Sequence, residues 1–432
     1  MRLTVIGTGY LGAVHAACMA EVGHEVLGVD VDEAKIAALA EGRAPFFEPG
    51  FPEILSRNLA AGRLRFTTSL AEAAAFGDVH FICVGTPQQP GSHGADLRYV
   101  DAVVDGLAPH LRPGALVVGK STVPVGTAAR LAAALPGAEL AWNPEFLREG
   151  FAVEDTLRPD RLVVGVTSTR AEQVLREVYA TMLEAGTPWV STDLATAELV
   201  KVAANSFLAT KISFINAMAE ICEATGGDVT TLATAIGYDA RIGDRFLRAG
   251  VGFGGGCLPK DIRAFRHRAE ELGLPESVRF LHEVDSINLR RRARAVSLAR
   301  ELVGGEFAGR SVAVLGATFK PDSDDIRDSP ALAVANTIRA EGARVTVHDP
   351  QGIDNARAAY PELDYSPGAQ KACEGADVVL HLTEWAEYRE LDPASLAEVV
   401  AAPALVDARN ALDLPAWRSA GWQVRALGRP RA

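Results

Sequence analysis

The sequence has few lysines, no regularly spaced cysteines and no long apolar run. Lysine occurs only seven times in 432 residues because arginine carries most of the positive charge, so a lysine within a motif is informative. None of the apolar runs is long enough to span a bilayer, and no membrane partner is expected. The five cysteines lack disulfide-type and metal-type spacing, which favours thiols in a reducing compartment and no metal site. We therefore expect a soluble cytoplasmic protein.

Positively charged residues are fewer than negatively charged ones. Lys and Arg number 43 against 55 Asp and Glu, giving a formal net charge of -12. This balance gives no basis for a nucleic-acid partner. Hydrophobic residues make up 48% of the 432 positions, enough for two or three cores. The composition therefore predicts a globular protein of two or three domains.

A dinucleotide fingerprint opens the chain. A short apolar strand at residues 3–6 leads into Gly7-Thr-Gly9-Tyr10-Leu11-Gly12, a helix to about residue 22 and a strand that ends at Asp30. The glycines allow the tight turn, the approach of a pyrophosphate and the packing of helix on strand, and the acidic residue accepts ribose hydroxyls. Asp30 would repel the 2′-phosphate of NADP. The pattern predicts an NAD-binding Rossmann unit; a structural glycine turn is the alternative.

Small polar residues follow the next two predicted strands, at 79–84 and 115–122. Thr86 and Thr122 stand where an open parallel sheet presents ligand contacts, so they are candidate cofactor contacts. Their alternative is an ordinary role as loop threonines. Glu145 and Glu149 come next in a turn near the same edge, where solvated carboxylates are the simpler interpretation.

Residues 195–224 contain no Gly or Pro and predict one long helix that is apolar on most sides. Such a helix is expected to be buried between domains or subunits. Lys201 and Asn205 are four residues apart and share a face. Because polar groups are costly on an apolar helix unless they have partners, we expect either a structural pair or a pair that faces a ligand.

The stretch Gly250-Val-Gly-Phe-Gly254-Gly-Gly-Cys257 is the most unusual in the chain. Its glycines let a ligand approach the main chain, and Pro259 suits the first turn of the helix that follows. Cys257 is thereby predicted just before a helix N-terminus with Lys260 one turn away, a setting that favours the thiolate. The sequence predicts a nucleophile, and a small buried cysteine is the alternative.

The remainder repeats the opening theme without its fingerprint. A strand at 311–316, a helix from Pro330 and a strand that ends at Asp349 mirror the first strand, helix and strand. Gly316-Ala-Thr-Phe-Lys320 replaces the glycine motif. We expect a second Rossmann-like unit for a different phosphorylated ligand, with Lys320 as a phosphate contact; chance similarity is the alternative. The predicted domains are 1–194, 195–303 and 304–432, with the middle one serving dimerisation and catalysis.

Taken together, the motifs resemble the nucleotide-sugar dehydrogenases of the UDP-glucose/GDP-mannose dehydrogenase family. The resemblance covers nearly the whole chain in order, and the Cys257 block is its most specific part. It implies an α/β fold with two Rossmann-like doubly wound domains joined by a long central helix. The motifs that carry it are Gly7–Gly12, Ser121–Thr127, Asn143–Gly150, the Lys201/Asn205 helix, Gly252–Asp261 and Gly316–Lys320.

The resemblance implies an NAD-dependent enzyme that oxidises a sugar C6 alcohol to a carboxylate in two steps. The helix at 199–216 is most similar to members that convert UDP-glucose to UDP-glucuronate; GDP-mannose or a UDP-N-acetylhexosamine remains an alternative substrate. Cys257 would carry a thiohemiacetal and then a thioester. Lys201 would stabilise oxyanions, Asp261 would act as base or position water, Glu145 would assist thioester hydrolysis, and Thr122 and Asn205 would order water and substrate.

The resemblance also assigns binding residues and a homodimer built on the long helix. Arg241 resembles an arginine that reaches the neighbouring subunit's substrate. A single-step hydroxyacid dehydrogenase and an NAD-sensing binding protein are the rival functions, and neither requires Cys257. The implied NAD contacts are Gly7, Gly9, Tyr10, Leu11, Gly12, Asp30, Lys35, Thr86, Thr122, Glu149, Lys260 and Arg327. The implied substrate contacts are Glu145, Phe146, Leu147, Arg148, Glu149, Lys201, Asn205, Arg241, Phe246, Leu247, Arg248, Ala249, Gly250, Gly254, Lys320 and Arg409.

Overall fold

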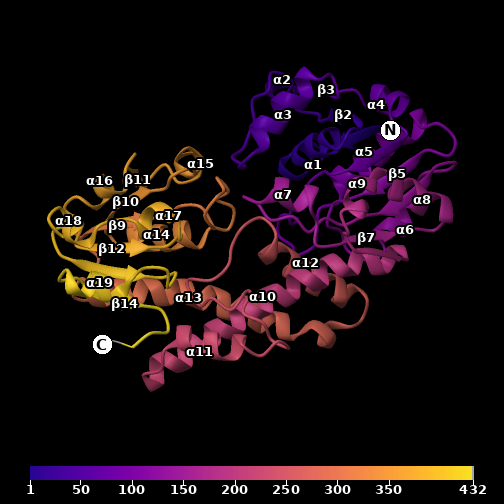
Figure 1. Ribbon diagram of the computed structural model, residues 1–432. Helices are drawn as coiled ribbons and strands as arrows, with labels where there is room; N and C mark the ends of the chain where they lie inside the picture. Colours follow the sequence, from indigo (N-terminus) through magenta and orange to yellow (C-terminus); the bar gives the residue numbers. More distant parts are fainter. Residues whose placement is uncertain (431–432) are drawn as a thin grey trace. The chain divides into compact units, whose positions relative to one another are not determined.

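The computed structural model describes residues 1–430, and the chain forms two compact units (Figure 1). Unit 1 comprises Met1–Ala204 and Arg263–Gly273, and unit 2 comprises Asn205–Ile262 and the chain from Leu274 onward. Two helices, α10 (Leu194–Thr225) and α12 (Leu258–Glu271), contribute residues to both units. No helix within residues 1–430 combines the length and apolar character needed to cross a membrane.

Unit 1 is built on an eight-stranded sheet with the order β3-β2-β1-β4-β5-β6-β7-β8. All neighbours pair in parallel except β6 and β7, which meet antiparallel at Trp142 and Gly165. The first six strands have the doubly wound order, so the switch point lies between β1 and β4. The strands are β1 Arg2–Ile6, β2 Glu25–Val29, β3 Leu64–Thr67, β4 Val79–Ile82, β5 Leu116–Gly119, β6 Glu139–Trp142, β7 Leu162–Gly165 and β8 Trp189–Thr192.

Helices cover both faces of this sheet, as parallel strands require. One core joins Leu3, Phe81 and Val118 to helices α1, α3, α7, α8 and α9. The other joins Ile82 and Val117 to α4, α5, α6 and the start of α10. The helices are α1 Tyr10–Glu21, α2 Glu33–Ala40, α3 Phe51–Ala60, α4 Leu70–Phe76, α5 Arg98–Leu107, η1 Ala108–His110, α6 Thr127–Ala133, α7 Ala152–Leu157, α8 Thr169–Val178 and α9 Ala180–Glu184.

Unit 2 contains a six-stranded parallel sheet with the order β11-β10-β9-β12-β13-β14 (orange to yellow in Figure 1). Its order matches that of the first six strands of unit 1, which confirms the second Rossmann-like domain. The strands are β9 Ser311–Leu315, β10 Arg344–His348, β11 Asp364–Tyr365, β12 Val378–His381, β13 Ala404–Asp407 and β14 Gln423–Ala426.

Two sets of helices cover the second sheet. The C-terminal half of α13 packs with α14 and α15 on one face, and α16 to α19 pack on the other. The helix predicted from Pro330 is α14, and a 3-10 turn, η2, precedes α13. The elements are α11 Val229–Gly237, η2 Pro275–Val278, α13 Phe280–Leu302, α14 Pro330–Ala340, α15 Ile353–Ala359, α16 Ala369–Cys373, α17 Ala386–Arg389, α18 Pro393–Ala397 and α19 Leu414–Ser419.

The long helix predicted at 195–224 is confirmed as α10, whose 32 residues span about 48 Å. It joins the two Rossmann-like domains in sequence. The helix predicted after Cys257 is α12, and it begins at Leu258. These two helices carry Lys201, Asn205 and Asp261, so the chain's predicted chemistry is concentrated on them.

Candidate active site

The glycines of the fingerprint have the roles that their spacing predicts. Gly7 adopts a left-handed φ of +93°, and a side chain there would lie 2.7 Å from Val84. A Cβ on Gly12 would collide with the carbonyl oxygen of Gly7, so only glycine lets α1 begin this close to β1. Within residues 1–430, and apart from its chain neighbours, no atom lies within 4 Å of where a Cβ on Gly9 would stand. This opening lets a pyrophosphate approach the main chain.

Asp30 stands at the end of β2 with its carboxylate already oriented. It accepts hydrogen bonds from the main-chain N–H of Thr8 at 2.8 Å and of Asp32 at 3.1 Å, and from Lys35 Nζ at 3.0 Å. Burial alone would raise the pKa of Asp30, but these donors, Lys35 first, hold it below its usual value. Asp30 and Lys35, both predicted as cofactor contacts, therefore lie together. The loop and this carboxylate fit an NAD pyrophosphate and ribose.

Tyr10, at the start of α1, connects the fingerprint to the turn that carries Glu145. Its hydroxyl hydrogen-bonds to Glu48, and the N–H of Gly150 lies 2.9 Å from the Tyr10 hydroxyl and 2.6 Å from Glu48 Oε2. Glu48 is 3% exposed and also accepts the N–H of Ala152 at 2.7 Å. The sequence analysis missed Glu48, because a single glutamate between prolines gives no local signal of its distant partners. Leu11 follows Tyr10 on α1 and packs on the core.

Thr86 and Thr122 lie side by side at the carboxyl ends of β4 and β5. Thr86 Oγ1 donates to the carbonyl oxygen of Thr122 at 2.7 Å, and Ser121 Oγ donates to that of Val84 at 2.6 Å. The expectation that the two strand ends meet at one edge is correct. Whether the threonines contact a cofactor stays a prediction.

Two helices hold the loop that follows Thr122. Glu198, on α10, accepts the N–H groups of Gly126 at 2.7 Å and Ala128 at 2.6 Å. Arg268, on α12, donates from Nε to the carbonyl oxygen of Val125 at 3.0 Å. Burial raises the pKa of Glu198, partly offset by these N–H donors. Glu198 and Arg268 were missed, because each reads in the sequence as an ordinary helical charge.

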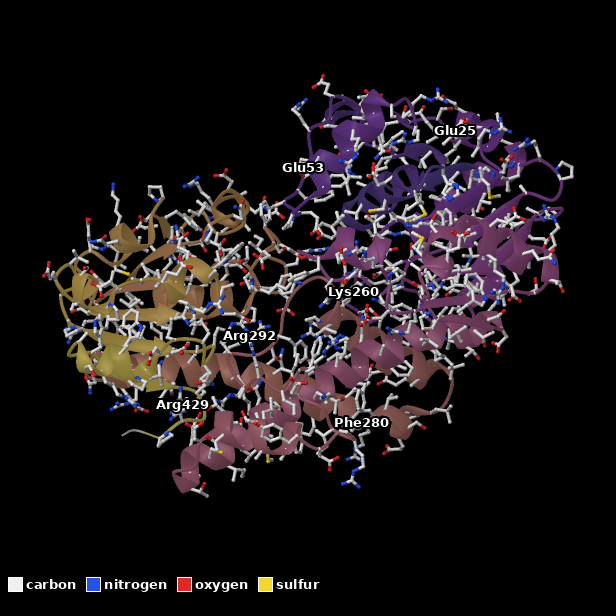
Figure 2. All side chains as sticks on the ribbon, viewed as in Figure 1. Glu25, Glu53, Lys260, Phe280, Arg292 and Arg429 are labelled. Atoms are coloured by element: carbon white, nitrogen blue, oxygen red, sulfur yellow. The ribbon has the colours of Figure 1, made fainter. Side chains whose placement is uncertain are left out.

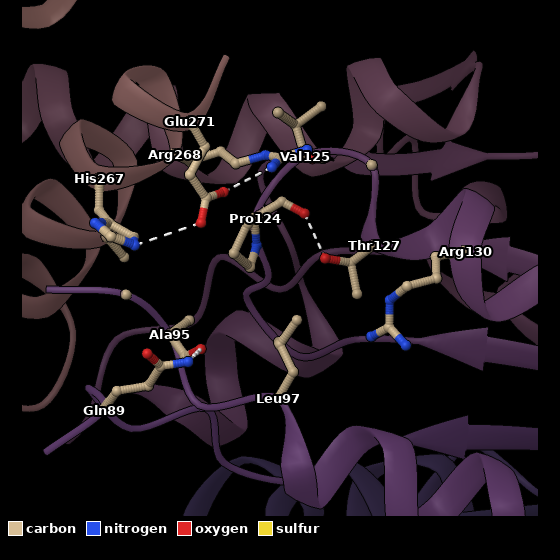
Figure 3. A pocket seen from close by; sticks show the side chains of 13 residues that line it. Gln89, Ala95, Leu97, Pro124, Val125, Thr127, Arg130, His267, Arg268 and Glu271 are labelled. Carbon is tan, nitrogen blue, oxygen red and sulfur yellow. Dashed lines mark hydrogen bonds and ion pairs between the residues drawn. The ribbon is translucent and has the colours of Figure 1, made fainter. Parts of the chain in front are cut away.

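A pocket of about 270 Å³ lies beside this loop (Figure 3). Arg268 and His267 both approach Glu271, at 2.6 and 3.4 Å, and Thr127 bonds back to the carbonyl oxygen of Pro124. Most of the residues that line the pocket are uncharged, and the ionisable ones, Arg130, His267, Arg268 and Glu271, all have partners. The pocket thus lies where Arg268 anchors the loop that follows Thr122.

Glu145 and Lys201 form a buried ion pair in unit 1. Glu145 Oε1 lies 3.0 Å from Lys201 Nζ, and the two side chains are 13% and 7% exposed. The Lys201 ammonium also lies 5.7 Å from the centre of the Phe146 ring. The sequence left two expectations for Lys201, a structural pair or a group that faces a ligand. The structure shows an ion pair, and the partner, Glu145, is itself a candidate catalytic residue.

Several other groups of the 145–149 segment bond to residues nearby in the sequence. The main-chain N–H of Leu147 donates to Glu145 Oε2 at 2.8 Å, and Arg148 pairs with Asp155 at 2.7 Å. Glu149 is half-buried. The Glu145 carboxylate therefore closes the turn that carries it, by accepting the N–H of Leu147.

In unit 2 the glycine-rich stretch before Cys257 packs tightly against residues 319–330. A Cβ on Gly254 would meet the Asp328 carbonyl oxygen, one on Gly256 would meet the Arg327 guanidinium, and one on Gly255 would lie 2.8 Å from the Phe319 ring. Only glycine fits at 254, where main chain blocks a side chain, and at 255, where φ is +85°, whereas the Arg327 side chain could move away from a Cβ at 256. Gly254, a predicted substrate contact, and Arg327, a predicted NAD contact, lie where these two segments pack together.

Three side chains anchor the stretch. Gly250 N–H donates to Asn216 Oδ1 at 2.9 Å, Phe253 N–H donates to Asn288 Oδ1 at 2.7 Å, and Arg409 Nη1 donates to the carbonyl oxygen of Gly252 at 2.9 Å. Arg292, labelled in Figure 2, bonds to Asp328 at 2.9 Å on the neighbouring segment. The main chain that leads to Cys257 is thereby fixed.

Cys257 is the exposed cysteine of the five, since the other four are buried. It precedes α12 directly, and its carbonyl oxygen accepts the first helical bond from the N–H of Asp261 at 2.9 Å. This outcome matches the prediction of a thiol at a helix N-terminus and excludes the buried alternative.

Asp261 has two side-chain partners that were also predicted from the sequence. Asn205 Nδ2 donates to Asp261 Oδ2 at 2.7 Å, and Lys260, labelled in Figure 2, pairs with Asp261 Oδ1. Asp261 is 2% exposed and Asn205 is 7% exposed. The buried amide predicted on the long helix therefore holds a buried carboxylate one turn beyond Cys257.

The predicted substrate residues at 246–250 alternate in exposure. Phe246 and Arg248 are exposed, whereas Leu247, Ala249 and Gly250 are buried. Phe246 adopts a left-handed φ of 65°, a strained conformation for a bulky residue. Strain of this kind is concentrated at ligand sites.

Arg409, Lys320 and Arg241 are three further predicted substrate contacts in unit 2, and their surroundings differ. Arg409 donates to three carbonyl oxygens and lies 3.3 Å from Glu384, and burial lowers the pKa of its guanidinium. Lys320 lies 5.6 Å from the centre of the Phe319 ring. Arg241 is 89% exposed and pairs with Asp239 at 2.6 Å.

In the second sheet Asp349 is the counterpart of Asp30, whose side chain is 10% exposed. Asp349 stands at the matching strand end but is 1% exposed. It accepts the N–H of Ala317 at 2.7 Å, the N–H of Thr318 at 3.0 Å and the indole N–H of Trp385 at 3.2 Å. This strand end is closed to a ribose, in keeping with the missing fingerprint.

Three family models match consecutive parts of the chain. They are described as the NAD binding, central and UDP binding domains of the UDP-glucose/GDP-mannose dehydrogenase family, and they match residues 1–183, 195–290 and 313–414. Among curated relatives, the UDP-glucose 6-dehydrogenase of Rhizobium meliloti is 44% identical over 100% of both chains. That of Pseudomonas aeruginosa is 42% identical over 100% of this chain and 98% of its own.

Solved structures agree with these matches. A UDP-glucose dehydrogenase from Pyrobaculum islandicum superposes with a TM-score of 0.89 at 39% identity over 98% of both chains. A UDP-D-ManNAc dehydrogenase from Pyrococcus horikoshii superposes with a TM-score of 0.88 at 27% identity over 100% of both chains. The fold, the fingerprint and the matches agree: the chain is an NAD-dependent oxidoreductase and belongs to the UDP-glucose/GDP-mannose dehydrogenase family.

Proposed function

We propose that this enzyme oxidises C6 of UDP-glucose to a carboxylate in two successive steps and releases UDP-glucuronate. The observation that carries the proposal is the exposed thiol of Cys257 at the start of α12, one turn before the Asp261–Asn205 pair. Relatives named UDP-glucose 6-dehydrogenase, 37–44% identical over nearly the full chain, support this substrate. The match to a UDP binding domain supports a uridine nucleotide.

Cys257 is the proposed nucleophile. Removal of the first hydride from C6 would give an aldehyde, to which the thiolate adds to form a thiohemiacetal. Loss of the second hydride gives a thioester, which water cleaves to the carboxylate and the restored thiol. Bound NAD supplies the hydride acceptor for each oxidation. The N-terminal end of α12 favours the thiolate.

Lys201 and Glu145 form the proposed charge pair of the reaction. The Lys201 ammonium would stabilise the oxygen anions that form at C6, because a buried cation acts strongly where water is excluded. Glu145 would assist proton transfer during thioester hydrolysis. Asp261 would position or deprotonate water, and Asn205 and Thr122 would orient water and substrate.

The proposed binding residues follow the sequence predictions. Gly7, Gly9, Gly12, Asp30 and Lys35 would hold the NAD pyrophosphate and adenosine ribose, and Thr86 and Thr122 would contact the remainder. Residues 145–149, 246–250, Lys320 and Arg409 would bind the nucleotide sugar. The three-part division at residues 194 and 303 and a cytoplasmic location remain predictions.

We also propose that α10 forms a homodimer interface. Phe207, Phe214 and Ile221 are 67%, 50% and 57% exposed, although large apolar side chains are normally buried. They recur every seven residues and therefore line one side of the helix. A second copy of the chain would cover this stripe, and the exposed Arg241 would reach the partner's substrate.

A different nucleotide sugar is the alternative substrate. It is supported by the superposition on a UDP-D-ManNAc dehydrogenase, although the identity to that chain is 27% against 39% for the UDP-glucose enzyme. Turnover with UDP-glucose, UDP-N-acetylmannosamine and GDP-mannose tests the choice. UDP-glucose should have the highest kcat/KM, and a higher value for another sugar would replace it.

A further inference from the structure

Lys120 is a buried cation that the proposed reaction does not use. It follows β5 directly, is 6% exposed and lies within the core of unit 1. Its Nζ donates to Asn143 Oδ1 at 2.9 Å, to the Asn143 carbonyl oxygen at 3.4 Å and to the Tyr179 hydroxyl at 3.5 Å. The rings of Phe81 and Tyr179 face it at 6.0 and 5.9 Å. These hydrogen-bond partners are all neutral.

A cation in such a place is costly to the fold. Burying an ammonium without a carboxylate partner forfeits its hydration, and hydrogen bonds to neutral oxygens repay only part of that loss. An apolar side chain of similar length would fill the same space at no such cost. A buried charge held by neutral partners, next to a candidate active site, points to a use for the charge itself.

The contacts of Lys120 converge on Asn143, two residues before Glu145. Asn143 Oδ1 also accepts the Tyr179 hydroxyl at 2.6 Å, and Asn143 Nδ2 donates to the Val163 carbonyl oxygen at 2.8 Å. The Asn143 N–H bonds to the Gly119 carbonyl oxygen at 2.8 Å. Lys120 therefore ties the end of β5 to the turn after β6 that presents Glu145.

We propose that Lys120 is a positioning residue for Glu145: its buried ammonium fixes the Asn143 turn and adds a second positive charge near Glu145. The proposal rests on the proposed role of Glu145. With Lys201 paired to Glu145 directly, the carboxylate would lie in the field of two cations. This arrangement keeps the Glu145 side chain aimed while the thioester is hydrolysed.

The charge on Lys120 should vary near neutral pH. Burial lowers the pKa of Lys120 to about 8, Cys83 and Glu145 act to raise it, and Lys201 acts to lower it. Of the other groups that face it, burial raises the pKa of Cys83 to about 12 and that of Tyr179 further, and lowers that of His15. These three are neutral near pH 8, so Glu145 and Lys201 are the charged groups that Lys120 acts on.

The test is the pH profile of kcat for Lys120→Met and Lys120→Arg, with the exposed Lys371→Met as matched control. Wild-type kcat should fall as pH rises through about 8, where Lys120 loses its proton. Lys120→Met should lower kcat about tenfold to a hundredfold, change KM for NAD little and abolish this decline. Lys120→Arg should restore most of kcat and move the decline to higher pH.

A second variant keeps the test decisive if Lys120→Met does not fold. Tyr179→Phe removes one hydroxyl that accepts from Lys120, so the decline should move to lower pH while the ring remains. Wild-type kcat in Lys120→Met, or a decline that none of these variants shifts, would overturn the proposal. The assays use whichever nucleotide sugar the wild-type protein turns over fastest, so a different substrate would revise the proposed function and leave this test intact.

Discussion

Asn205 holds the carboxylate of Asp261 through a 2.7 Å hydrogen bond, and Lys260 pairs with the other carboxylate oxygen. Each partner thus binds a different oxygen, which fixes the plane of the carboxylate. A carboxylate held in this way is oriented by its neighbours before any substrate arrives, as pre-organised catalysis requires.

Replacing Asn205 by Ala should lower kcat about tenfold to a hundredfold, because Asp261 loses the donor that orients it. Asn205→Asp should be worse, since it places a second carboxylate against the first. Steady-state kinetics with varied NAD and sugar would measure the effect. Equal kcat in the wild type and both variants would remove Asn205 from the mechanism.

Cys257→Ser should accumulate an ester-linked intermediate, because an ester is cleaved by water more slowly than a thioester. Intact-protein mass spectrometry after mixing with UDP-glucose and NAD would detect the added mass. Cys257→Ala, the matched control, should carry no adduct and form no carboxylate. Normal glucuronate output from Cys257→Ala would refute the covalent route.

Glu198→Gln should loosen the loop after Thr122. The glutamate accepts two N–H groups with its two oxygens, and an amide would set an N–H₂ donor against one of them. We expect a raised KM for NAD and faster amide hydrogen exchange over residues 122–128. Unchanged exchange there would show that Glu198 does not anchor the loop.

Lys120 should make the free energy of unfolding depend on pH in the alkaline range. Its folded-state pKa of about 8 lies below the unfolded value of about 10.4, so between these pH values the unfolded chain binds more protons and stability rises with pH. The free energy of unfolding of wild type minus that of Lys120→Met should therefore increase from pH 8 to pH 10. Urea unfolding at several pH values checks this, and a constant difference would contradict it.

Phe214→Asp should convert a dimer to a monomer, because it places a charge in the middle of the exposed stripe on α10. The side chain is 50% exposed in one chain, so the substitution should cost little folding stability. Tyr99→Asp, at a 52% exposed position on α5, is the matched control. Light scattering would report the mass of each. A wild-type monomer, or a dimeric Phe214→Asp, would argue against this interface.

The parts of the site that sequence could predict are those encoded by neighbours along the chain. Gly7, Gly12 and Asp30 form one strand-helix-strand pattern, and Cys257 precedes its helix directly. Lys201 and Asn205 were singled out because they share one face of a helix that is apolar on most sides.

The contacts that sequence could not predict join segments far apart. Glu48 bonds to Gly150, Glu198 to Gly126 and Lys120 to Asn143, and none of these pairs shares a local pattern. Strands β7 and β8 were also not predicted.

The central claim is a four-electron oxidation, and the yield of NADH per UDP-glucose tests it most directly. With limiting sugar and excess NAD, the reaction should run to two NADH per UDP-glucose and leave UDP-glucuronate as the product. A yield of one NADH would contradict the account, because a simple alcohol dehydrogenase would stop at the aldehyde and would need no Cys257.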